Sequence, residues 1–229
     1  MQNQSNLELT ILMPCLNEEK TVGACVREAA AYLEASGCTG EVLVCDNGST
    51  DRSAAIAEEN GARVVLCPDK GYGHALRHGM AQARGAVIIM GDCDQSYDFL
   101  SIGEMHRLLG GEADVVIGNR FAAPPDASAI SFSHRIGAPL LSLAARMRFG
   151  CDVVDFHCGL RGLTKSALDR MQFSCGGMEF ATEMIAEAQR KGLRIAQTPV
   201  VLREDGRDGP SHLRTVRDGL RHLFFILRG

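Results

Sequence analysis

The sequence predicts an α/β fold: a doubly wound, mainly parallel sheet with helices on both faces. Three observations lead to this fold class. Short β-rich apolar runs alternate with longer segments of helical periodicity, which is the pattern of βαβ units. The run at 86–90 is apolar throughout, as a central strand covered on both faces requires. The 229-residue chain is 45% hydrophobic and 23% charged, which is typical of a globular protein.

The first half of the chain supplies the regular alternation. We expect strands at residues 7–13, 41–45, 62–67, 86–90 and 114–117. A helix is expected at 20–36, because its apolar residues recur on one helical face. Further helices follow the second and third strands, and Ser49 or Thr50 is a natural N-cap for the first of these. Right-handed crossovers then bring the carboxyl ends of the strands to one edge, where open α/β sheets bind ligands.

The second half is less regular. Residues 124–128 read as a loop, 134–149 as an apolar helix interrupted by Pro139, 180–191 as an amphipathic helix and 193–202 as an outer strand. A charged loop at 204–210 precedes a final helix with one apolar face, formed by Val216, Leu220, Leu223, Phe224 and Leu227. We therefore expect a main domain over 1–210 and a C-terminal amphipathic helix over 211–229.

Composition and charge exclude several classes of protein. The net charge of −4 provides no positive field for a nucleic acid. No run of about 18 apolar residues exists to cross a bilayer, and MQNQSNLELT has the features of neither a secretory nor a lipidation signal. Nine cysteines without CxxC spacing predict reduced thiols rather than disulfides or a zinc site. We expect a cytoplasmic protein.

Two acidic residues follow the central strand directly. Asp92 and Asp94 are one residue apart in Gly91-Asp92-Cys93-Asp94, so both carboxylates can point to one side and bind a divalent cation that neutralises a diphosphate. The alternative is an ordinary Asp-rich turn. We favour the metal site because Asp46 ends another strand at the same edge.

Three further strand ends carry candidate ligand-binding groups. Asp46-Asn47-Gly48-Ser49 could bind a base or ribose, or form only a capping turn. The loop Pro14-Cys15-Leu16-Asn17-Glu18-Glu19 could line the same cleft or simply connect strand to helix. Gly71 and Gly73 would let the backbone approach a ligand closely. Their spacing is neither that of a Walker loop nor that of a dinucleotide fingerprint, which disfavours a kinase or a dehydrogenase.

These motifs together resemble a known family. MPCLNEE, CDNGSTD, KGYGHALRHGM, IIMGDCDQSYDF, GNRF, DFHCGLRG and GMEFATEM occur in this order, and the chain from about Leu9 to Leu227 resembles glycosyltransferase family 2, most closely its dolichyl- or polyprenyl-phosphate hexose synthase branch. The resemblance implies a GT-A fold, an inverting mechanism, a UDP- or GDP-linked sugar donor, and Mg²⁺ or Mn²⁺.

The same resemblance implies roles for individual residues. The nucleoside site would be lined by Pro14, Leu16, Glu18 and Asp46, and the ribose, metal and diphosphate would be bound by Asp92 and Asp94. The acceptor phosphate would be bound by Arg120 and Arg135, with Arg161 and Glu183 as later cleft residues and Arg207 in a basic loop over the diphosphate. Two positions depart from the family pattern: Ser96 stands where a metal-contacting Gln is common, and His212 where a Lys is common.

The acceptor is expected to be a phosphate. Hydroxyl-transferring relatives place a Glu-Asp pair where this chain has Glu179-Phe180, whereas a phosphate needs no general base at pH 7. Guanidinium groups suit phosphate oxygens, although Arg120 and Arg135 could instead form salt bridges or face solvent. His157 and Asp155 could act as a base or orient the acceptor, or be purely structural.

Alternatives to lipid-phosphate glycosylation stay open. These are a soluble glycosyltransferase acting on a hydroxyl group, a nucleotidyltransferase, and a non-catalytic binding module. The final helix could contact anionic lipid at the cytosolic face of a membrane through its apolar stripe and arginines. It could instead pack on the sheet with its arginines in water.

Overall fold

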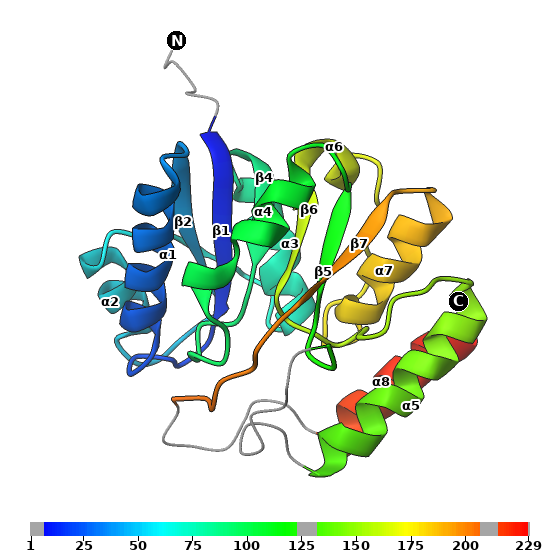
Figure 1. Ribbon diagram of the computed structural model, residues 1–229. Coiled ribbons are helices and arrows are strands. Elements are labelled where there is room, and N and C mark those ends of the chain that lie inside the picture. The colour runs from blue at the N-terminus through cyan, green and yellow to red at the C-terminus, as the bar shows by residue number, and fades with distance from the viewer. Residues whose placement is uncertain (1–6, 123–131, 207–214, 229) are drawn as a thin grey trace.

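The structure is a computed structural model that describes residues 7–122, 132–206 and 215–228. Its helices and strands run in chain order as follows (Figure 1): β1 (Leu7–Cys15), α1 (Val22–Ser36), β2 (Gly40–Asp46), α2 (Ser53–Glu59), β3 (Arg63–Leu66), α3 (Tyr72–Gln82), β4 (Gly85–Met90), η1 (Phe99–Ser101), α4 (Gly103–Leu109), β5 (Val115–Asn119), α5 (Phe132–Phe149), β6 (Arg161–Thr164), α6 (Lys165–Leu168), α7 (Phe180–Arg190), β7 (Ile195–Pro199) and α8 (Thr215–Arg228). The α/β class and the expected order of strands are confirmed.

The seven described strands form one sheet in the order β3-β2-β1-β4-β6-β5-β7. Every neighbouring pair is parallel except β4–β6 and β5–β6, where β6 runs antiparallel. The sheet is therefore mainly parallel, as expected. The sequence did not predict β6, because the four residues Arg-Gly-Leu-Thr show neither an apolar run nor a clear alternation.

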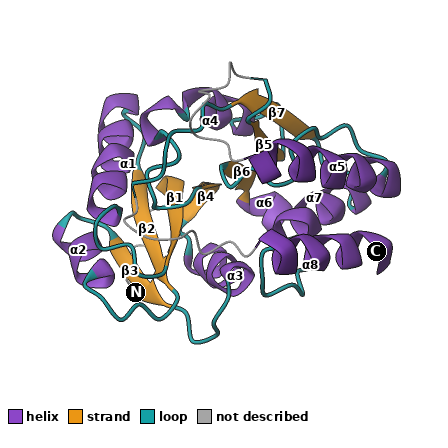
Figure 2. Ribbon diagram, turned by 90° about the horizontal axis from the view of Figure 1, so that it is seen from below, coloured by secondary structure: helices purple, strands orange, loops and turns teal. Residues whose placement is uncertain are grey.

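Helices cover both faces of this sheet (Figure 2). On one face α1 and α4 pack together, and the Tyr32 hydroxyl lies 3.0 Å from Nδ1 of His106. On the other face α3 and α6 meet, where the Lys165 ammonium donates to the carbonyl oxygen of Met80 at 3.2 Å. The central strands are consequently buried on both sides: Leu9, Ile11, Leu12 and Met13 of β1 are completely inaccessible to solvent.

The outer strand expected at 193–202 is present at the edge of the sheet, although it is shorter, Ile195–Pro199. The expected interruption at Pro139 was wrong. Helix α5 passes through Pro139 without interruption, because a proline removes one backbone hydrogen bond and a long helix can continue on either side of it.

Helices α5 and α8 lie side by side next to α7, beside the sheet (Figures 1 and 2). The buried side of α8 presents Asp218, His222 and Ile226, whereas its apolar stripe is exposed: Leu220 is 60%, Leu223 38%, Phe224 53% and Leu227 71% accessible. The described part of the helix is therefore packed, as the alternative expected, but against α5 and α7 in place of the sheet and with the apolar stripe outside. Within the described ranges, no helix combines the length and apolarity needed to span a bilayer.

Candidate active site at the carboxyl edge of the sheet

The loops after β1 and β2 are held together by hydrogen bonds. The amide nitrogen of Asn17 donates to Oγ of Ser49 at 2.9 Å, and that of Glu18 donates to Oγ of Ser53 at 2.7 Å. In return, the amide of Thr50 donates to Oδ1 of Asn17 at 2.8 Å. Asn17 has a positive φ of 54°, which an Asn tolerates better than most residues. The two strand ends thus form one rigid wall.

Asp46 and Asn47 shape the turn after β2. The Asp46 carboxylate, only 4% exposed, accepts from the amides of Gly48 and Ser49 at 3.2 Å. Asn47 connects this turn to the next loop: its Nδ2 donates to the carbonyl of Asp69, and its Oδ1 accepts from the amide of Gly71, both at 2.7 Å. This turn caps no helix: α2 begins at Ser53, and its N-cap residue Arg52 makes no side-chain capping hydrogen bond, so the cap expected at Ser49 or Thr50 is wrong. The Asn47 bonds place the turn beside the one that begins α3.

The glycines at the start of α3 pack against a loop from the other half of the chain. A Cβ on Gly71 would lie 2.2 Å from the carbonyl oxygen of Gly176, and one on Gly73 would lie 2.6 Å from that of Cys175. Gly71 also has a φ of 141°, which favours glycine. The glycines thus make room for the loop at 174–177, a reason that sequence spacing could not reveal. The amides of Tyr72 and Gly73 in the first turn have no partner within the helix and can face an anion.

The acidic pair after β4 lies in a tightly bonded loop. Asp94 is 6% exposed, and its Oδ1 accepts from the amide of Ser96 at 3.0 Å and from its hydroxyl at 2.5 Å. The Asp94 carbonyl accepts from the amide of Gly206 at 2.9 Å. Ser96, which stands where the family commonly has Gln, therefore orients the Asp94 carboxylate. The described segment that ends at Gly206 lies beside this loop.

Two tyrosines lie near Asp92, the half-buried Tyr72 and the buried Tyr97, and sequence analysis did not single them out. Burial, and after it the charge of Asp92, raises the pKa of the Tyr72 phenol well above its usual range. Burial likewise raises the pKa of Tyr97, whose electrostatic neighbours include both Asp92 and Arg120. The Tyr97 hydroxyl accepts from the amide of Gly159 at 2.7 Å, and a Cβ on Gly159 would lie 2.6 Å from Oδ2 of Asp92. The tyrosines thus place Asp92 near Arg120.

Arg120 is fixed by a carboxylate beneath it. Its Nε donates to Oδ2 of Asp155 at 2.7 Å and its Nη2 to Oδ1 at 2.9 Å. Burial tends to raise the pKa of Asp155, but the hydrogen bonds and charge of Arg120 outweigh it and keep that pKa below its usual range. These two bonds engage two of the five N–H donors of a guanidinium. Arg120 therefore forms the salt bridge that the sequence left open as an alternative, and Asp155 holds its guanidinium in one orientation.

The neighbouring His157 is enclosed. Its Nδ1 lies 3.4 Å from Oγ of Ser142, its Nε2 is buried with no partner among the described residues, and its ring meets that of His222 edge-on at 4.5 Å. Burial, together with the charge of His222, lowers the pKa of His157 to about 3. His157 is thus a neutral side chain of the packed interior at neutral pH.

Arg161 and Glu183, which were expected to contact the acceptor, are instead bonded to main-chain groups inside the protein. Arg161 in β6 is 1% exposed and donates to the carbonyls of Cys158 and Ala181. Glu183 is 3% exposed and accepts from the amide of Ser174 at 2.8 Å and that of Cys175 at 2.9 Å. These contacts favour positioning roles over contact with an acceptor, because both side chains are enclosed and already bonded.

The remaining expected residues are located as far as the structure describes them. Glu18 is buried and accepts from the Thr21 hydroxyl at 3.2 Å, while Pro14 and Leu16 lie at the end of β1. Arg135 belongs to α5, but its side chain lies outside the described part of the structure. Arg207 and His212 also lie outside the described residues.

The acidic pair suits a hard divalent cation. Among the described residues no three His, Cys, Asp or Glu side chains form a metal-binding cluster. Mg²⁺ commonly uses one or two carboxylates and completes its shell with water and phosphate oxygens. Asp92 and Asp94 offer such a partial set of oxygen ligands, so the donor chemistry fits a cation bound together with a phosphate-bearing ligand.

Two curated relatives of the chain are named as hexose transferases. The chain is 38% identical over 221 residues to the low-salt glycan biosynthesis hexosyltransferase Agl6 of Haloferax volcanii, covering 96% of this chain and 53% of Agl6, so it spans about half the length of that relative. It is 25% identical to the dolichyl-phosphate hexose transferase of the same organism, covering 86% of this chain and 83% of the relative.

A solved structure shares the fold. Glucosyl-3-phosphoglycerate synthase from Mycobacterium tuberculosis, in complex with Mn²⁺, UDP-glucose and phosphoglyceric acid, aligns with a TM-score of 0.74 at 23% identity, over 96% of this chain and 79% of that one. The fold is thus the GT-A fold of such glycosyltransferases. The family model described as Glycosyl transferase family 2 matches residues 10–171. The chain belongs to glycosyl transferase family 2.

Proposed function

We propose that the protein is an inverting, metal-dependent hexosyltransferase that moves a sugar from a nucleotide-diphosphate donor to a polyprenyl-phosphate-type acceptor. The observation that carries this proposal is the geometry of the segment at 155–159. A Cβ on Gly159 would lie 2.6 Å from Oδ2 of Asp92, and Asp155 binds the Arg120 guanidinium at 2.7 and 2.9 Å. A group that suits a cation and a group that suits a phosphate thus both adjoin this one short segment.

The donor would lie against the carboxyl ends of β1, β2 and β4. Asp46 and the loop at 14–18 line the wall where the nucleoside would bind, and the free amides in the first turn of α3 suit the diphosphate. Asp92 and Asp94 would bind Mg²⁺ or Mn²⁺, which stabilises the negative charge of a diphosphate leaving group. The Mycobacterium tuberculosis synthase was crystallised with Mn²⁺ and UDP-glucose, which supports this class of donor.

The acceptor phosphate would be bound by Arg120, with Arg135 as a second cation. Asp155 holds the Arg120 guanidinium in one orientation, which prepares its outer N–H groups for the oxygens of a phosphate. The curated relative named a dolichyl-phosphate hexose transferase supports an acceptor of this kind. Arg161 and Glu183 would act indirectly, by fixing the backbone around the cleft.

The reaction follows from this placement of two anions. An oxygen of the acceptor phosphate attacks the anomeric carbon of the sugar from the side opposite the diphosphate. The bond between that carbon and the diphosphate oxygen breaks, its electron pair leaves with the nucleoside diphosphate, and the configuration inverts. A phosphate is already deprotonated at pH 7, so the enclosed His157 need not accept a proton.

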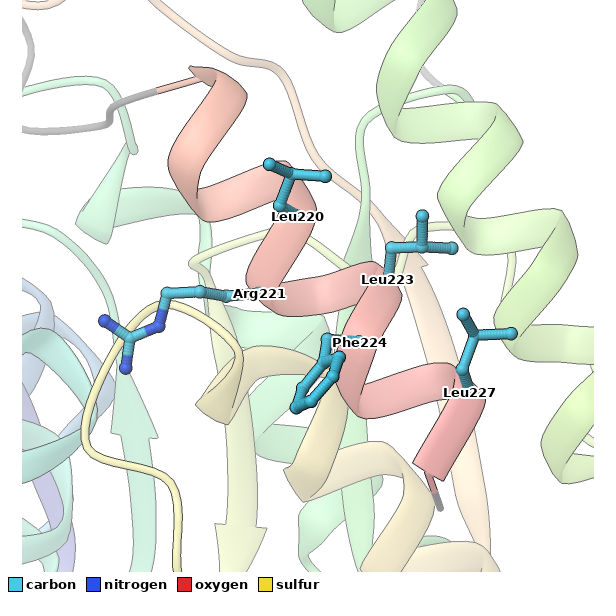
Figure 3. Close-up of a pocket in the computed structure, with 5 residues that line it drawn as sticks. All are labelled: Leu220, Arg221, Leu223, Phe224 and Leu227. Carbon is cyan, nitrogen blue, oxygen red and sulfur yellow. The ribbon is translucent and has the colours of Figure 1, made fainter.

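The outer face of α8 would contact the cytosolic face of a membrane. Its exposed stripe of Leu220, Leu223, Phe224 and Leu227 lines an open apolar pocket of about 350 Å³ (Figure 3). Apolar residues flanked by arginines, here Arg217 and Arg228, are typical of helices that lie in an anionic lipid interface. A lipid acceptor supports this placement, because its chain stays in the bilayer.

Titration calorimetry with UDP- and GDP-linked hexoses in the presence of Mn²⁺ tests the donor part of the proposal. One donor should bind, and binding should fall at least about tenfold in Asp94→Asn or with chelator, because a carboxylate ligand is lost. Asp152→Asn, at a fully exposed carboxylate, is the matched control and should bind like the wild type. Equal binding by wild type and Asp94→Asn would contradict the metal site.

A further inference from the structure

The first turn of α3 depends on the loop at 174–177 that covers it. The amide of His74 donates to the carbonyl of Gly176 at 3.2 Å. The carbonyl oxygens of Cys175 and Gly177 would lie 2.6 and 2.9 Å from a Cβ on Gly73. No side chain fits between the turn and the loop, so a displacement of the loop changes the surroundings of the turn directly.

Two glutamates hold this loop: Glu183 in α7 and Glu179, the N-cap residue of that helix. At its beginning Glu183 binds the amides of Ser174 and Cys175. At its end Oε1 of Glu179 accepts from the amide of Gly177 at 3.3 Å. The first anchor is buried within the domain, whereas the second extends to another helix.

That second helix is α8. Nη2 of Arg221 donates to Oε1 of Glu179 at 2.7 Å, with 41% of the arginine side chain and 10% of the glutamate side chain exposed. Burial tends to raise the pKa of Glu179, but the hydrogen bond from Arg221 outweighs it and lowers that pKa. A Cβ on Gly177 would lie 2.6 Å from Cζ of Arg221, so the guanidinium covers the end of the loop.

A second contact fixes α8 one residue further on. The Thr182 hydroxyl lies 2.8 Å from Nδ1 of His222, which is 6% exposed. In Figure 3 Arg221 projects toward the loop before α7, whereas Leu223 and Leu227 project from the other side of the helix. The polar side of α8 thus contacts the loop at 174–177 and the start of α7, whereas its apolar stripe stays exposed.

We infer that Arg221 is a positioning residue for the donor site: through Glu179 it holds the loop at 174–177 against the Gly71–Gly73 turn, so that the turn binds the diphosphate only when α8 is docked. This inference rests on the proposed function, because it takes that turn as part of the donor site. The arginine itself touches neither donor nor acceptor.

The test compares donor binding and kinetics in matched variants of the full chain. In Arg221→Ala the affinity for the UDP- or GDP-linked hexose that the wild type binds with Mn²⁺ should fall about three- to tenfold, as expected for a partly exposed ion pair. The donor KM should rise likewise, while kcat and the acceptor KM change little. Arg107→Ala breaks another partly exposed ion pair, that of Arg107 with Glu104 on α4 at 2.8 Å, and should change donor affinity by less than about twofold.

A double-mutant cycle separates positioning from a general loss of stability. Glu179→Gln should weaken donor binding in the same way, and the double variant should be no worse than the single ones, because both act through one contact. Unchanged donor affinity in Arg221→Ala, or strictly additive losses, would overturn the inference. If the wild type binds no nucleotide sugar at all, the proposed function fails first and the inference falls with it. If Arg221→Ala fails to fold, Arg221→Lys, which keeps the charge without the planar fork, decides by the same measurements.

Discussion

The guanidinium of Arg120 and the carboxylate of Asp155 face each other in a two-point contact, with Nε–Oδ2 at 2.7 Å and Nη2–Oδ1 at 2.9 Å, and Asp155 is wholly inaccessible to solvent. A buried carboxylate that orients an arginine affects both the stability of the fold and the direction of the guanidinium. The contact therefore has consequences that can be measured separately.

Asp155→Asn should destabilise the protein and weaken acceptor binding. The variant leaves Arg120 without its counter-charge, which costs about 3 kcal/mol in the free energy of unfolding, measured by urea denaturation. The acceptor KM should rise while donor affinity stays close to that of the wild type. A fall in donor affinity with an unchanged acceptor KM would contradict the placement of Arg120 in the acceptor site.

Stability should depend on pH between about 4.5 and 6.5 through two histidines. Burial lowers the pKa of His157 to about 3 and that of His222 to about 4, from 6.5. In this window the unfolded chain binds more protons than the folded one, so stability rises with pH and is lost on acidification, by up to about 1.4 kcal/mol per pH unit for each histidine.

Urea midpoints measured from pH 4.5 to 7 check this dependence. The carboxyls of Asp155 and Glu179 have lowered pKa values, so their contribution is complete well above their ordinary pKa values and is lost mostly below this window, with only the Glu179 contribution beginning to fall at its acid end. His222→Gln should flatten the dependence, whereas His78→Gln, on α3, should leave it steep. A flat profile in the wild type would show that the two histidines are not enclosed.

Gly73→Ala should disturb the α3 turn. Its new Cβ would meet two carbonyl oxygens of the loop at 2.6 and 2.9 Å, which costs about 1–3 kcal/mol, and donor affinity should fall with it. Gly219→Ala is the control: its Cβ meets no described atom within 4 Å, and alanine in a helix should stabilise it by about 0.5–1 kcal/mol. Thermal unfolding measures the stability of both variants, and calorimetry measures their donor affinity. If Gly73→Ala were as stable as Gly219→Ala and bound the donor equally well, the tight contact between the α3 turn and the loop would be contradicted.

The exposed stripe of α8 should carry membrane binding. Phe224→Glu should reduce co-flotation with anionic liposomes at least about tenfold, because one buried large apolar side chain contributes about 1.5–3 kcal/mol. Leu66→Glu changes an equally apolar residue, 70% exposed, on the edge strand β3 and should float like the wild type. Identical flotation of both variants would exclude the stripe as the contact surface.

The sequence predicted the sheet edge well, because strand ends are marked by local chemistry. Asp46, Asp92 and Asp94 follow apolar runs whose burial the structure confirms, and parallel strands place such residues together. Periodicity also identified the apolar stripe of α8. It could not say which side of the helix is buried, since that depends on His222 and Arg221 finding partners on α7.

What sequence reasoning missed are contacts between distant segments. Nothing local marks Tyr97 as the neighbour of both Asp92 and Arg120, or shows that Gly71 and Gly73 leave room for a loop a hundred residues away. Arg161 illustrates the opposite case: its motif suggested a cleft residue, but β6 places it in the interior, where it donates to main-chain carbonyls.

Product analysis tests the central claim most directly. The protein would be incubated with the nucleotide sugar that it binds, Mn²⁺, and either a polyprenyl phosphate or the matching polyprenol, and the products identified by mass spectrometry. We expect one hexose added to the polyprenyl phosphate, linked through its phosphate, no product from the polyprenol, and no product with chelator. Transfer to the polyprenol or to a water-soluble hydroxyl acceptor, with none to the phosphate, would contradict this expectation.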